Sequence, residues 1–457
     1  MSKTCLMIVA GERSGDVYGA RLATALKQRL PEIELFGCGG EAMRHAGVET
    51  TVDARQFAMV GITEVISGLP RAYRAFHELL DETDRRRPKL AVLIDSPSLN
   101  LRLAKQLKRR RITVAYFVSP QIWAWKRWRL GQLKTRIDKM LCIFDFEEGI
   151  YQRAGIPVEY VGHPLVDTVE ASLTREVFFA QAGLDPDTPT VALLPGSREI
   201  EVSLILPTML KAAAQLARAR PVQFVIAAAA TIDPAWLEST FLKRDPTRAT
   251  LRKMANEAVR QAIINPVRLA RHRVKTSAGV PDALGDALPS LDAAWWQPGL
   301  ERHTVSGAAV CTITHSTYDA LRHSDVAVVA SGTATVEAAL LERPMVVVYR
   351  VAPLTGFLAR FMVSVPHYSM VNLLAGKAVV PELIQSDFTA EKVAAQVGHL
   401  LDHAEARETM KAELRTLKSR LGFGGAIERA ADAVVRMLEP SRASVSAAQV
   451  VGEALPP

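Results

Sequence analysis

The chain has 457 residues, too many for a single hydrophobic core, so at least two domains are expected. With 49% apolar and 23% charged residues, it has the composition of an ordinary soluble globular protein and not that of a disordered or fibrous chain. The net charge of +8 favours a polyanionic partner, but composition does not choose among nucleic acid, an anionic membrane and a phosphorylated substrate.

The cysteines and the apolar runs indicate the compartment. Cys5, Cys38, Cys142 and Cys311 lie far apart and lack metal-ligand spacing, which predicts free thiols in a reducing compartment. The short apolar run within residues 1–10 leads directly into a loop and a helix, so it predicts a first β-strand and not a signal peptide. No apolar run approaches the roughly 18 residues that a transmembrane helix requires. We therefore expect a cytoplasmic protein with at most peripheral membrane contact.

Short apolar runs alternate with helical patterns from residue 5 onward, which predicts an α/β fold built from βαβ units with parallel, doubly wound sheets. The strands expected in a first sheet are at residues 6–10, 33–36, 90–94, 113–118, 140–144 and 158–161. The pattern then restarts, with a second set at residues 191–194, 223–227, 310–313, 325–330 and 345–349.

The restart predicts two successive domains with a boundary near residues 164–184. The divisions expected are residues 1–165, residues 166–385, a set of C-terminal helices at 386–440 and a disordered tail at 441–457. In open α/β sheets, ligands bind beyond the carboxyl ends of the strands. The candidate site residues are therefore sought in the loops that follow strands.

One such loop follows the apolar run 325–330. Ser331 and Gly332 form a predicted tight turn, and a helical pattern begins at Thr333. A turn of this kind presents unpaired backbone N–H groups and the positive end of a helix dipole, which suits a phosphate. Glu337 lies one helical turn further on, where its carboxylate can accept hydrogen bonds from a ribose diol. The alternative is an ordinary strand-to-helix turn with a surface glutamate.

A second loop of the same set, at residues 195–198, follows the strand at 191–194 and contains Ser197 and Arg198. A guanidinium group here is suited to hold a diphosphate through two parallel hydrogen bonds. A surface arginine at a turn is the competing interpretation. Two such loops in one sheet favour an anion site more than either loop does alone.

The loop after the first strand carries Glu12 and Ser14. Its glycines, at positions 11, 15 and 19, do not form the GxGxxG pattern, which argues against a dehydrogenase. The loop still brings hydroxyl and carboxylate groups to the edge of the first sheet.

Asp95 ends the strand at residues 90–94, beside apolar residues that are expected to raise its pKa by desolvation. A carboxylate in such a position suits a general base. A helix-capping or turn-forming aspartate is the alternative.

Three further features have two interpretations each. Trp123 and Trp125 precede a basic cluster and offer stacking surfaces for sugars, lipid headgroups or bases. His163 at the domain junction is more often structural than catalytic. Residues 243–275 hold ten lysines and arginines against two acids, typical of a basic amphipathic helix on an anionic bilayer or of a solvated helix packed on the domain.

Taken together, these motifs resemble the lipid-A-disaccharide synthase family. The ordered set is AGERSGD at 10–16, IDSPSLN at 94–100, SPQIWAWK at 119–126, VGHPL at 161–165, LLPGSREIE at 193–201, SGTATVEAAL at 331–340, PMVVVYRVAP at 344–353 and NLLAGKAVVPELIQ at 372–385. It covers nearly the whole chain except residues 231–309 and the tail. That stretch is longer than the family usually carries and contains the basic segment, so its role is not inherited from the resemblance.

The resemblance implies a GT-B fold, in which two Rossmann-like domains face each other across a cleft and the C-terminal helices cross back to the N-terminal domain. It implies an inverting glycosyltransferase that joins UDP-2,3-diacylglucosamine to 2,3-diacylglucosamine 1-phosphate and releases UDP, a step in lipid A and lipopolysaccharide biosynthesis in Gram-negative bacteria. No metal-binding DxD pair stands beside the phosphate loops, so neither a metal nor another cofactor is expected.

Carried onto this chain, the resemblance places the acceptor in the first domain and UDP in the second. Asp95 takes the proton from the acceptor 6-hydroxyl, with Glu12 as the rival base and Ser14 beside them. The residues placed at UDP are Ser197, Arg198, Ser331, Gly332, Thr333, Glu337 and Asn372.

The acylated substrates imply a peripheral association with the inner membrane. An apolar cluster in the first domain is the candidate docking face, with a core-facing helix as the alternative; together with Trp123 and Trp125 it comprises Met59, Val60, Ile62, Val65, Ile66 and Leu69. Nucleic acid is not expected as a partner, and a homodimer is compatible with the resemblance. The alternatives are another UDP-sugar enzyme of the same fold, such as a UDP-GlcNAc 2-epimerase, and less favoured, a membrane-binding module.

Overall fold

The structure is a computed structural model that describes residues 4–57, 62–121, 129–242, 303–305, 309–351 and 367–439. The described chain divides into two compact units. Unit 1 comprises residues 1–166 together with the C-terminal segment from residue 421, and unit 2 comprises residues 167–420.

Unit 1 is a seven-stranded parallel sheet in the order β3-β2-β1-β4-β5-β6-β7. Its strands are β1 (Cys5–Ala10), β2 (Glu34–Gly39), β3 (Glu49–Asp53), β4 (Leu90–Ile94), β5 (Thr113–Phe117), β6 (Lys139–Cys142) and β7 (Val158–Tyr160). Its helices are α1 (Arg13–Arg29), α2 (Glu41–His45), α3 (Ile62–Arg86), α4 (Pro97–Arg109), α5 (Arg129–Arg136), α6 (Asp145–Arg153) and α17 (Ala426–Leu438). Short 3₁₀ turns occupy Ala54–Gln56 and Pro164–Asp167.

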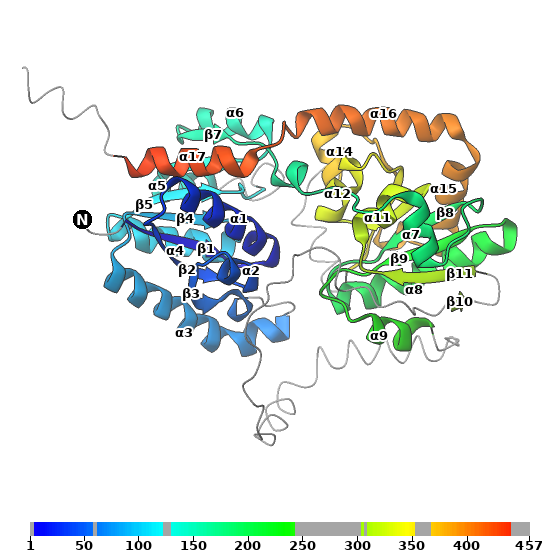
Figure 1. Ribbon diagram of the computed structural model, residues 1–457, viewed down its shortest axis with the longest axis horizontal. Coiled ribbons are helices and arrows are strands. Elements are labelled where there is room, and N and C mark those ends of the chain that lie inside the picture. The colour runs from blue at the N-terminus through cyan, green and yellow to red at the C-terminus, as the bar shows by residue number, and fades with distance from the viewer. Residues whose placement is uncertain are drawn as a thin grey trace, which may run out of the picture. The chain divides into compact units, whose positions relative to one another are not determined.

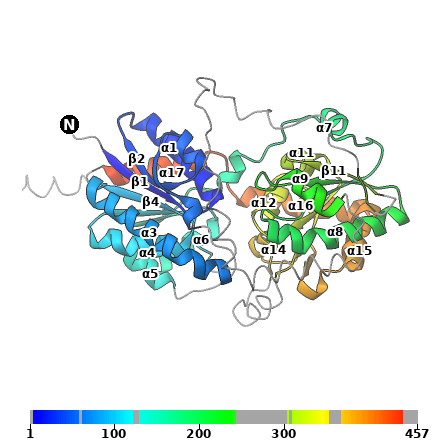
Figure 2. The same cartoon turned by 90° about the horizontal axis from the view of Figure 1, so that it is seen from below.

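Helices cover both faces of this sheet because the central strands are apolar on both sides. Along β1, for example, Met7 and Val9 pack into a core with α3, α4 and α5, while the alternate residues face the other way. Figure 2 shows α1 on the opposite side of the sheet from α3, α4 and α5. Helix α17 packs along α1, and Arg29 of α1 forms ion pairs with Glu428 and Asp432 of α17. The chain therefore returns to unit 1 for its last described helix (Figure 1).

Unit 2 repeats the same plan in the order β10-β11-β9-β8-β12-β13-β14, parallel except for β10. Its strands are β8 (Thr190–Leu194), β9 (Gln223–Ala227), β10 (His303–Val305), β11 (Ala309–Thr314), β12 (Val326–Ala330), β13 (Met345–Tyr349) and β14 (Glu382–Ile384). Its helices are α7 (Arg175–Ala182), α8 (Glu199–Ala219), α9 (Pro234–Leu237), α11 (Thr317–His323), α12 (Thr333–Leu340), α14 (Met370–Ala375), α15 (Ala390–Asp402) and α16 (Ala404–Arg420). A π-helical turn spans Glu238–Leu242, and a 3₁₀ turn spans Gln385–Asp387.

The two doubly wound parallel sheets predicted from the sequence are confirmed, and three strands were missed. Strands β3 and β14 lie at sheet edges and carry polar residues, as in Glu-Thr-Thr-Val-Asp at Glu49–Asp53, so they lack the apolar run of a central strand. Strand β10 has only three residues. An apolar run marks a strand that is buried on both faces and fails for a short edge strand.

Helix α8 corrects one expectation about membrane segments. It is long and apolar enough to cross a membrane by length and composition. Val202, Ile205, Leu206 and Met209 are nevertheless buried inside unit 2, where α8 packs beside α15. Within the described residues, α8 is a core helix.

Candidate functional site

Both sheets reverse their strand order at one point, and each reversal brings two of the predicted loops together. In unit 1 the reversal lies between β1 and β4, whose last residues, Ala10 and Ile94, are paired. The loops that begin at Gly11 and Asp95 therefore start at neighbouring positions on one edge of the sheet. In unit 2 it lies between β8 and β12. Such reversals are where open α/β sheets bind ligands. The candidate residues therefore form two sets, one in each unit.

In unit 1, the loop after β1 is short and tightly packed. Glu12 is exposed and occupies the N-cap position of α1, and Ser14 is half-buried in the first turn. Gly11 lies against the neighbouring loop: a Cβ there would stand 2.8 Å from the hydroxyl oxygen of Ser96. The loop after β1 and the loop after β4 are consequently in direct contact at the edge of the sheet.

The Asp95–Ser96 turn has an unusual backbone. Asp95 has φ of 46° and Ser96 has φ of 42°, so two successive non-glycine residues are left-handed. The backbone N–H of Asp95 donates to the carbonyl of Phe117 (3.0 Å), which keeps the turn attached to β5. The Ser96 hydroxyl is buried and has no hydrogen-bond partner among the described residues.

The carboxyl group of Asp95 has the electrostatics of a general base. Burial, and secondarily the negative charge of Glu12, raise its pKa to about 6, while a backbone hydrogen bond from Ser96 acts in the opposite direction. A carboxylate with this pKa is largely ionised at neutral pH and is more basic than an exposed one. The desolvation expected from the apolar strand is thus present.

Asp16, by contrast, is a structural residue. Its buried carboxylate accepts hydrogen bonds from the backbone N–H groups of Gly40 (2.6 Å), Ala42 (3.1 Å) and Met43 (3.2 Å), so it caps α2.

In unit 2, the loop after β12 has the predicted strand–turn–helix form. Gly332 has φ of 151°, which favours glycine, and its carbonyl accepts a hydrogen bond from the hydroxyl of Thr335 (2.8 Å). Gly332 and Thr333 are exposed, and apart from Gly332 and its two chain neighbours no described atom lies within 4 Å of where a Cβ of Gly332 would stand. The N-terminus of α12 is therefore open to a ligand, as an anion site requires.

Glu337 lies one turn into α12. Burial raises the pKa of its carboxyl group, and a hydrogen bond from the hydroxyl of Tyr318 (3.4 Å) partly opposes that shift. Its Tyr318 partner, on α11, was not predicted as a site residue.

The loop after β8 lies next to this turn because β8 and β12 are paired neighbours. The exposed guanidinium of Arg198 lies 3.3 Å from a carboxylate oxygen of Glu201, and the backbone N–H of Ser197 donates to the same carboxylate. The carbonyl of Ser197 accepts from the hydroxyl of Thr231 (2.6 Å). This short-range ion pair leaves Arg198 at the surface, available to an anion.

Asn372 lies in a saturated hydrogen-bond network. Its amide group donates to the carbonyl of Val380 and to the carboxylate of Glu382, both at 2.8 Å, and its oxygen accepts from the N–H groups of Val379 (2.7 Å) and Val380 (2.9 Å). Its side chain is buried and all four hydrogen-bonding positions are used. In this conformation Asn372 orients the neighbouring loop and has no free group for a ligand.

Several predicted residues lie outside the described residues: Met59, Val60, Trp123, Trp125, the basic segment 243–275 and the tail. Helix α3 contains Ile62, Val65, Ile66 and Leu69, but only their backbone is described and not their side chains.

His163 has the structural role that the sequence favoured. Burial lowers its pKa to about 4, and its Nδ1 accepts a hydrogen bond from the N–H of Leu165 (3.1 Å). A neutral imidazole with this bond closes the turn after β7.

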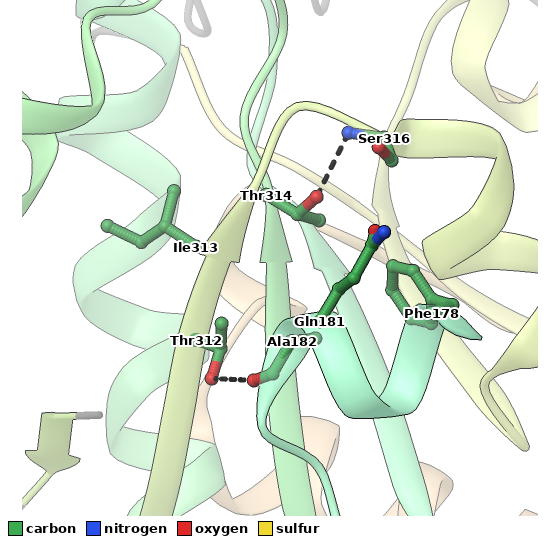
Figure 3. Close-up of a pocket in the computed structure, with 7 residues that line it drawn as sticks. All are labelled: Phe178, Gln181, Ala182, Thr312, Ile313, Thr314 and Ser316. Atoms are coloured by element: carbon green, nitrogen blue, oxygen red, sulfur yellow. Dashed lines mark hydrogen bonds between the residues drawn. The ribbon is translucent and has the colours of Figure 1, made fainter. Parts of the chain in front are cut away.

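A small pocket lies elsewhere in unit 2, between α7 and the end of β11 (Figure 3). Its cavity of about 10 Å³ has room for no more than one water molecule. Thr312 and Thr314 line it, and their hydroxyls hydrogen-bond to the backbone of Ala182 and Ser316. The pocket is too small for a nucleotide or a sugar.

Sequence reasoning missed the residues that support the site. Among them are Asn100 and Tyr116, which donate to the carbonyl of Asp95. Tyr318 donates to Glu337, and Glu382 accepts from Asn372. Asn100 lies in the motif at residues 94–100 and Glu382 in the motif at residues 372–385, but their spacing did not distinguish them from their neighbours.

Solved structures with this arrangement define the class of fold. The UDP-GlcNAc 2-epimerase of Neisseria meningitidis bound to UDP-GlcNAc has a TM-score of 0.56 at 12% identity, covering 95% of this chain and 100% of that chain. The calicheamicin glycosyltransferase CalG4 has a TM-score of 0.53 at 15% identity, covering 97% and 100%. The chain thus has the GT-B fold of two Rossmann-like parallel-sheet units. At these identities the likeness shows the fold alone, so it does not favour the epimerase alternative.

Sequence relatives identify the family. The family model described as lipid-A-disaccharide synthetase matches residues 6–262 and 301–434. The lipid-A-disaccharide synthase of Myxococcus xanthus is 39% identical over 438 residues, covering 96% of this chain and 98% of its own length. That of Syntrophus aciditrophicus is 37% identical over 442 residues, covering 96% and 100%. The chain belongs to the lipid-A-disaccharide synthase family, whose members are glycosyltransferases.

Proposed function

We propose that this chain transfers a 2,3-diacylglucosamine unit from UDP-2,3-diacylglucosamine to 2,3-diacylglucosamine 1-phosphate, with inversion at the anomeric carbon, and releases UDP. Family membership supports the reaction. The observation in the structure that carries it is the pair of strand-order reversals, one with a carboxylate of raised pKa and the other with an open phosphate-binding turn.

The chemistry divides between the two sets of residues. Asp95 takes the proton from the acceptor 6-hydroxyl while that oxygen forms a bond to the donor anomeric carbon. The bond from that carbon to the UDP oxygen breaks, and the electron pair leaves with UDP. Glu12, which raises the pKa of Asp95, is the rival base, and Ser14 lies in the same loop. Disaccharide formation with Glu12→Gln and not with Asp95→Asn assigns the base to Asp95.

The leaving UDP acquires negative charge, which calls for fixed positive groups. We assign this task to Arg198 and to the backbone N–H groups of Gly332 and Thr333, with Ser197 beside them and the Ser331 N–H holding the turn to the carbonyl of Val348. Glu337 would accept from the ribose diol. Asn372 acts through its hydrogen bonds and does not touch UDP, which modifies the role expected from its motif.

The decisive experiment uses purified full-length protein in detergent micelles with the diacylated donor and acceptor. Disaccharide and UDP should form in equal amounts and should do so in the presence of a chelator. Loss of product with chelator would overturn the metal-independent mechanism. Conversion of UDP-GlcNAc alone to UDP-N-acetylmannosamine, or to N-acetylmannosamine plus UDP, would instead favour an epimerase.

We further propose that the protein works at the cytoplasmic face of the inner membrane, because both proposed substrates carry acyl chains. Sedimentation with anionic vesicles tests this location. Binding that falls with increasing salt supports it, and absence of binding to vesicles that contain the acceptor would contradict it.

A further inference from the structure

Two successive left-handed residues, Asp95 and Ser96, precede α4. Non-glycine residues in this conformation persist only when their surroundings hold them there. Because Asp95 carries the proposed base, whatever holds the turn also decides where the carboxylate points.

Asn100 binds the Asp95–Ser96 turn through its side-chain amide. It is completely buried in the first turn of α4, and its amide group donates to the carbonyls of Ile94 (2.9 Å) and Asp95 (2.8 Å). An asparagine near a helix N-terminus usually accepts hydrogen bonds from the backbone N–H groups of its own helix. Here the amide donates to two carbonyls that precede the helix, so its function is not that of an N-cap.

Tyr116 binds the same turn from β5. Its hydroxyl donates to the carbonyl of Asp95 at 2.5 Å, so this one carbonyl receives hydrogen bonds from two side chains. Burial raises the pKa of Tyr116 well above its usual value, which keeps the hydroxyl protonated and a donor at any pH used for assay. The same turn is also held by the backbone bond from Asp95 to Phe117.

We propose that Asn100 and Tyr116 are positioning residues that hold the Asp95–Ser96 turn left-handed and thereby aim the Asp95 carboxylate at the acceptor hydroxyl. Neither touches the reacting atoms. This role rests on the proposed function only for its effect on turnover. The effect on the carboxylate itself is independent of any substrate.

The charged and titratable groups that influence this site come from the β1–α1 loop, β5, α5 and α6. Glu12, in the β1–α1 loop, acts on Asp95, and Tyr116, on β5, is itself influenced by Asp95, Tyr151 and Arg129. None of the substitutions proposed below alters Glu12. A shift in the titration of Asp95 therefore reports the geometry of the turn and not a change in neighbouring charge.

Two substitutions test the role. Tyr116→Phe removes one hydroxyl and keeps the ring, and Asn100→Ala removes both amide donors. As the turn relaxes, the carboxylate becomes better hydrated, so the acid limb of the pH–kcat profile should move to lower pH by half a unit or more. We expect kcat to fall about 5-fold for Tyr116→Phe and 30-fold or more for Asn100→Ala, with KM for the UDP-sugar unchanged.

Because both side chains act on one carbonyl, their effects should not be additive. The double variant should lose less than the product of the two single losses. Independent, multiplicative losses would contradict a shared role on the Asp95 carbonyl.

Thr83→Val is the matched control. Thr83 is also buried and also donates from a hydroxyl to a carbonyl, that of Leu79 (2.7 Å), but it lies in α3. This variant should lose stability comparable to that of Tyr116→Phe and keep the wild-type pH–kcat profile. If Thr83→Val moves the profile equally, the effect is one of general stability and the positioning role is wrong.

A second measurement does not depend on turnover. With ¹³C-labelled aspartate carboxyl carbons, the signal absent from Asp95→Asn gives the titration of Asp95 directly. Folded Asn100→Ala or Tyr116→Phe with an unchanged Asp95 titration would overturn the inference. A shifted titration in a protein that makes no disaccharide would preserve the inference and overturn the proposed function.

Discussion

The hydroxyl of Ser331 donates a hydrogen bond of 3.1 Å to the backbone carbonyl of Tyr368, 37 residues further along the chain. The loop that contains Tyr368 is held in turn by Glu382, whose carboxylate accepts from the N–H groups of Tyr368 (2.9 Å) and Ser369 (2.8 Å). The proposed phosphate turn is therefore supported by a side chain on the edge strand β14. Its geometry depends on a residue that lies outside the turn itself.

Glu382→Gln should weaken UDP binding about tenfold. The amide replaces one carboxylate oxygen with a donor group, which would face an N–H donor and lose that hydrogen bond. Titration calorimetry with UDP measures the change. Glu413→Gln, which removes only an exposed ion pair with Lys377, should leave UDP affinity unchanged. Equal affinities in all three proteins would show that the loop does not support the turn.

Arg198→Ala should lower kcat/KM by about 10- to 100-fold, because a hydrogen bond to a charged group is worth roughly 1.5–3 kcal/mol. Arg198→Lys should restore less than a tenth of the wild-type value, since an ammonium group cannot form two parallel bonds to a phosphate. Steady-state kinetics with the UDP-sugar give both values. Arg220→Ala, which removes an ion pair with Asp402 at the C-terminal end of α8, serves as the control. Full activity of the lysine variant would mean that charge alone suffices.

Asp95→Asn should lower kcat by about 10²- to 10⁴-fold, the usual contribution of a general base. In the wild-type enzyme, the rate should rise with pH and level off above an apparent pKa near 6, since only the ionised carboxylate accepts a proton. UDP affinity should stay unchanged because the donor residues are in the other unit. A pH-independent rate between pH 5 and 7 would rule out Asp95 as the base.

The sequence predicted the fold because long central strands are encoded by local apolar runs. It predicted Asp95, Arg198 and Ser331 as neighbours of strand ends because parallel strands end at the same edge of a sheet. It did not predict Asn100 or Glu382 as supports, because their roles depend on backbone carbonyls and N–H groups that only the folded chain brings near. Asn372 illustrates the limit: its motif suggested a ligand contact, but its neighbours occupy the whole amide group.

Gly11→Ala should impair activity more than stability. The added methyl would lie 2.8 Å from the Ser96 hydroxyl oxygen, so the Asp95–Ser96 turn must shift. We expect a loss of at least tenfold in kcat, measured beside thermal unfolding. Gly131→Ala in α5 is the matched control, because nothing lies within 4 Å of its added methyl, and alanine in a helix should raise stability by about 0.5–1 kcal/mol. A fully active Gly11→Ala variant would indicate that the turn tolerates displacement.

His163 should make unit 1 sensitive to acid. Its pKa is about 4 in the folded state, against 6.5 when exposed, so the unfolded chain binds the proton more readily between these values. The contribution of His163 to the free energy of unfolding is therefore fully present above pH 6.5 and is lost as the pH drops toward 4. The loss reaches up to about 3 kcal/mol, at 1.36 kcal/mol for each pKa unit. Asp95 acts in the opposite direction, since its raised pKa favours the folded state as the pH falls below about 6.

The two groups can be separated by hydrogen exchange of unit 1 at pH 7.5 and pH 5. His163→Asn, whose side-chain oxygen can still accept from Leu165, should be less stable at pH 7.5 because the ring contact with Phe144 is lost, but should lose less on acidification. Asp95→Asn should lose more than the wild type over the same interval, because the opposing contribution is gone. If both variants follow the wild-type pH dependence, neither group controls the acid stability of the sheet that carries the proposed base.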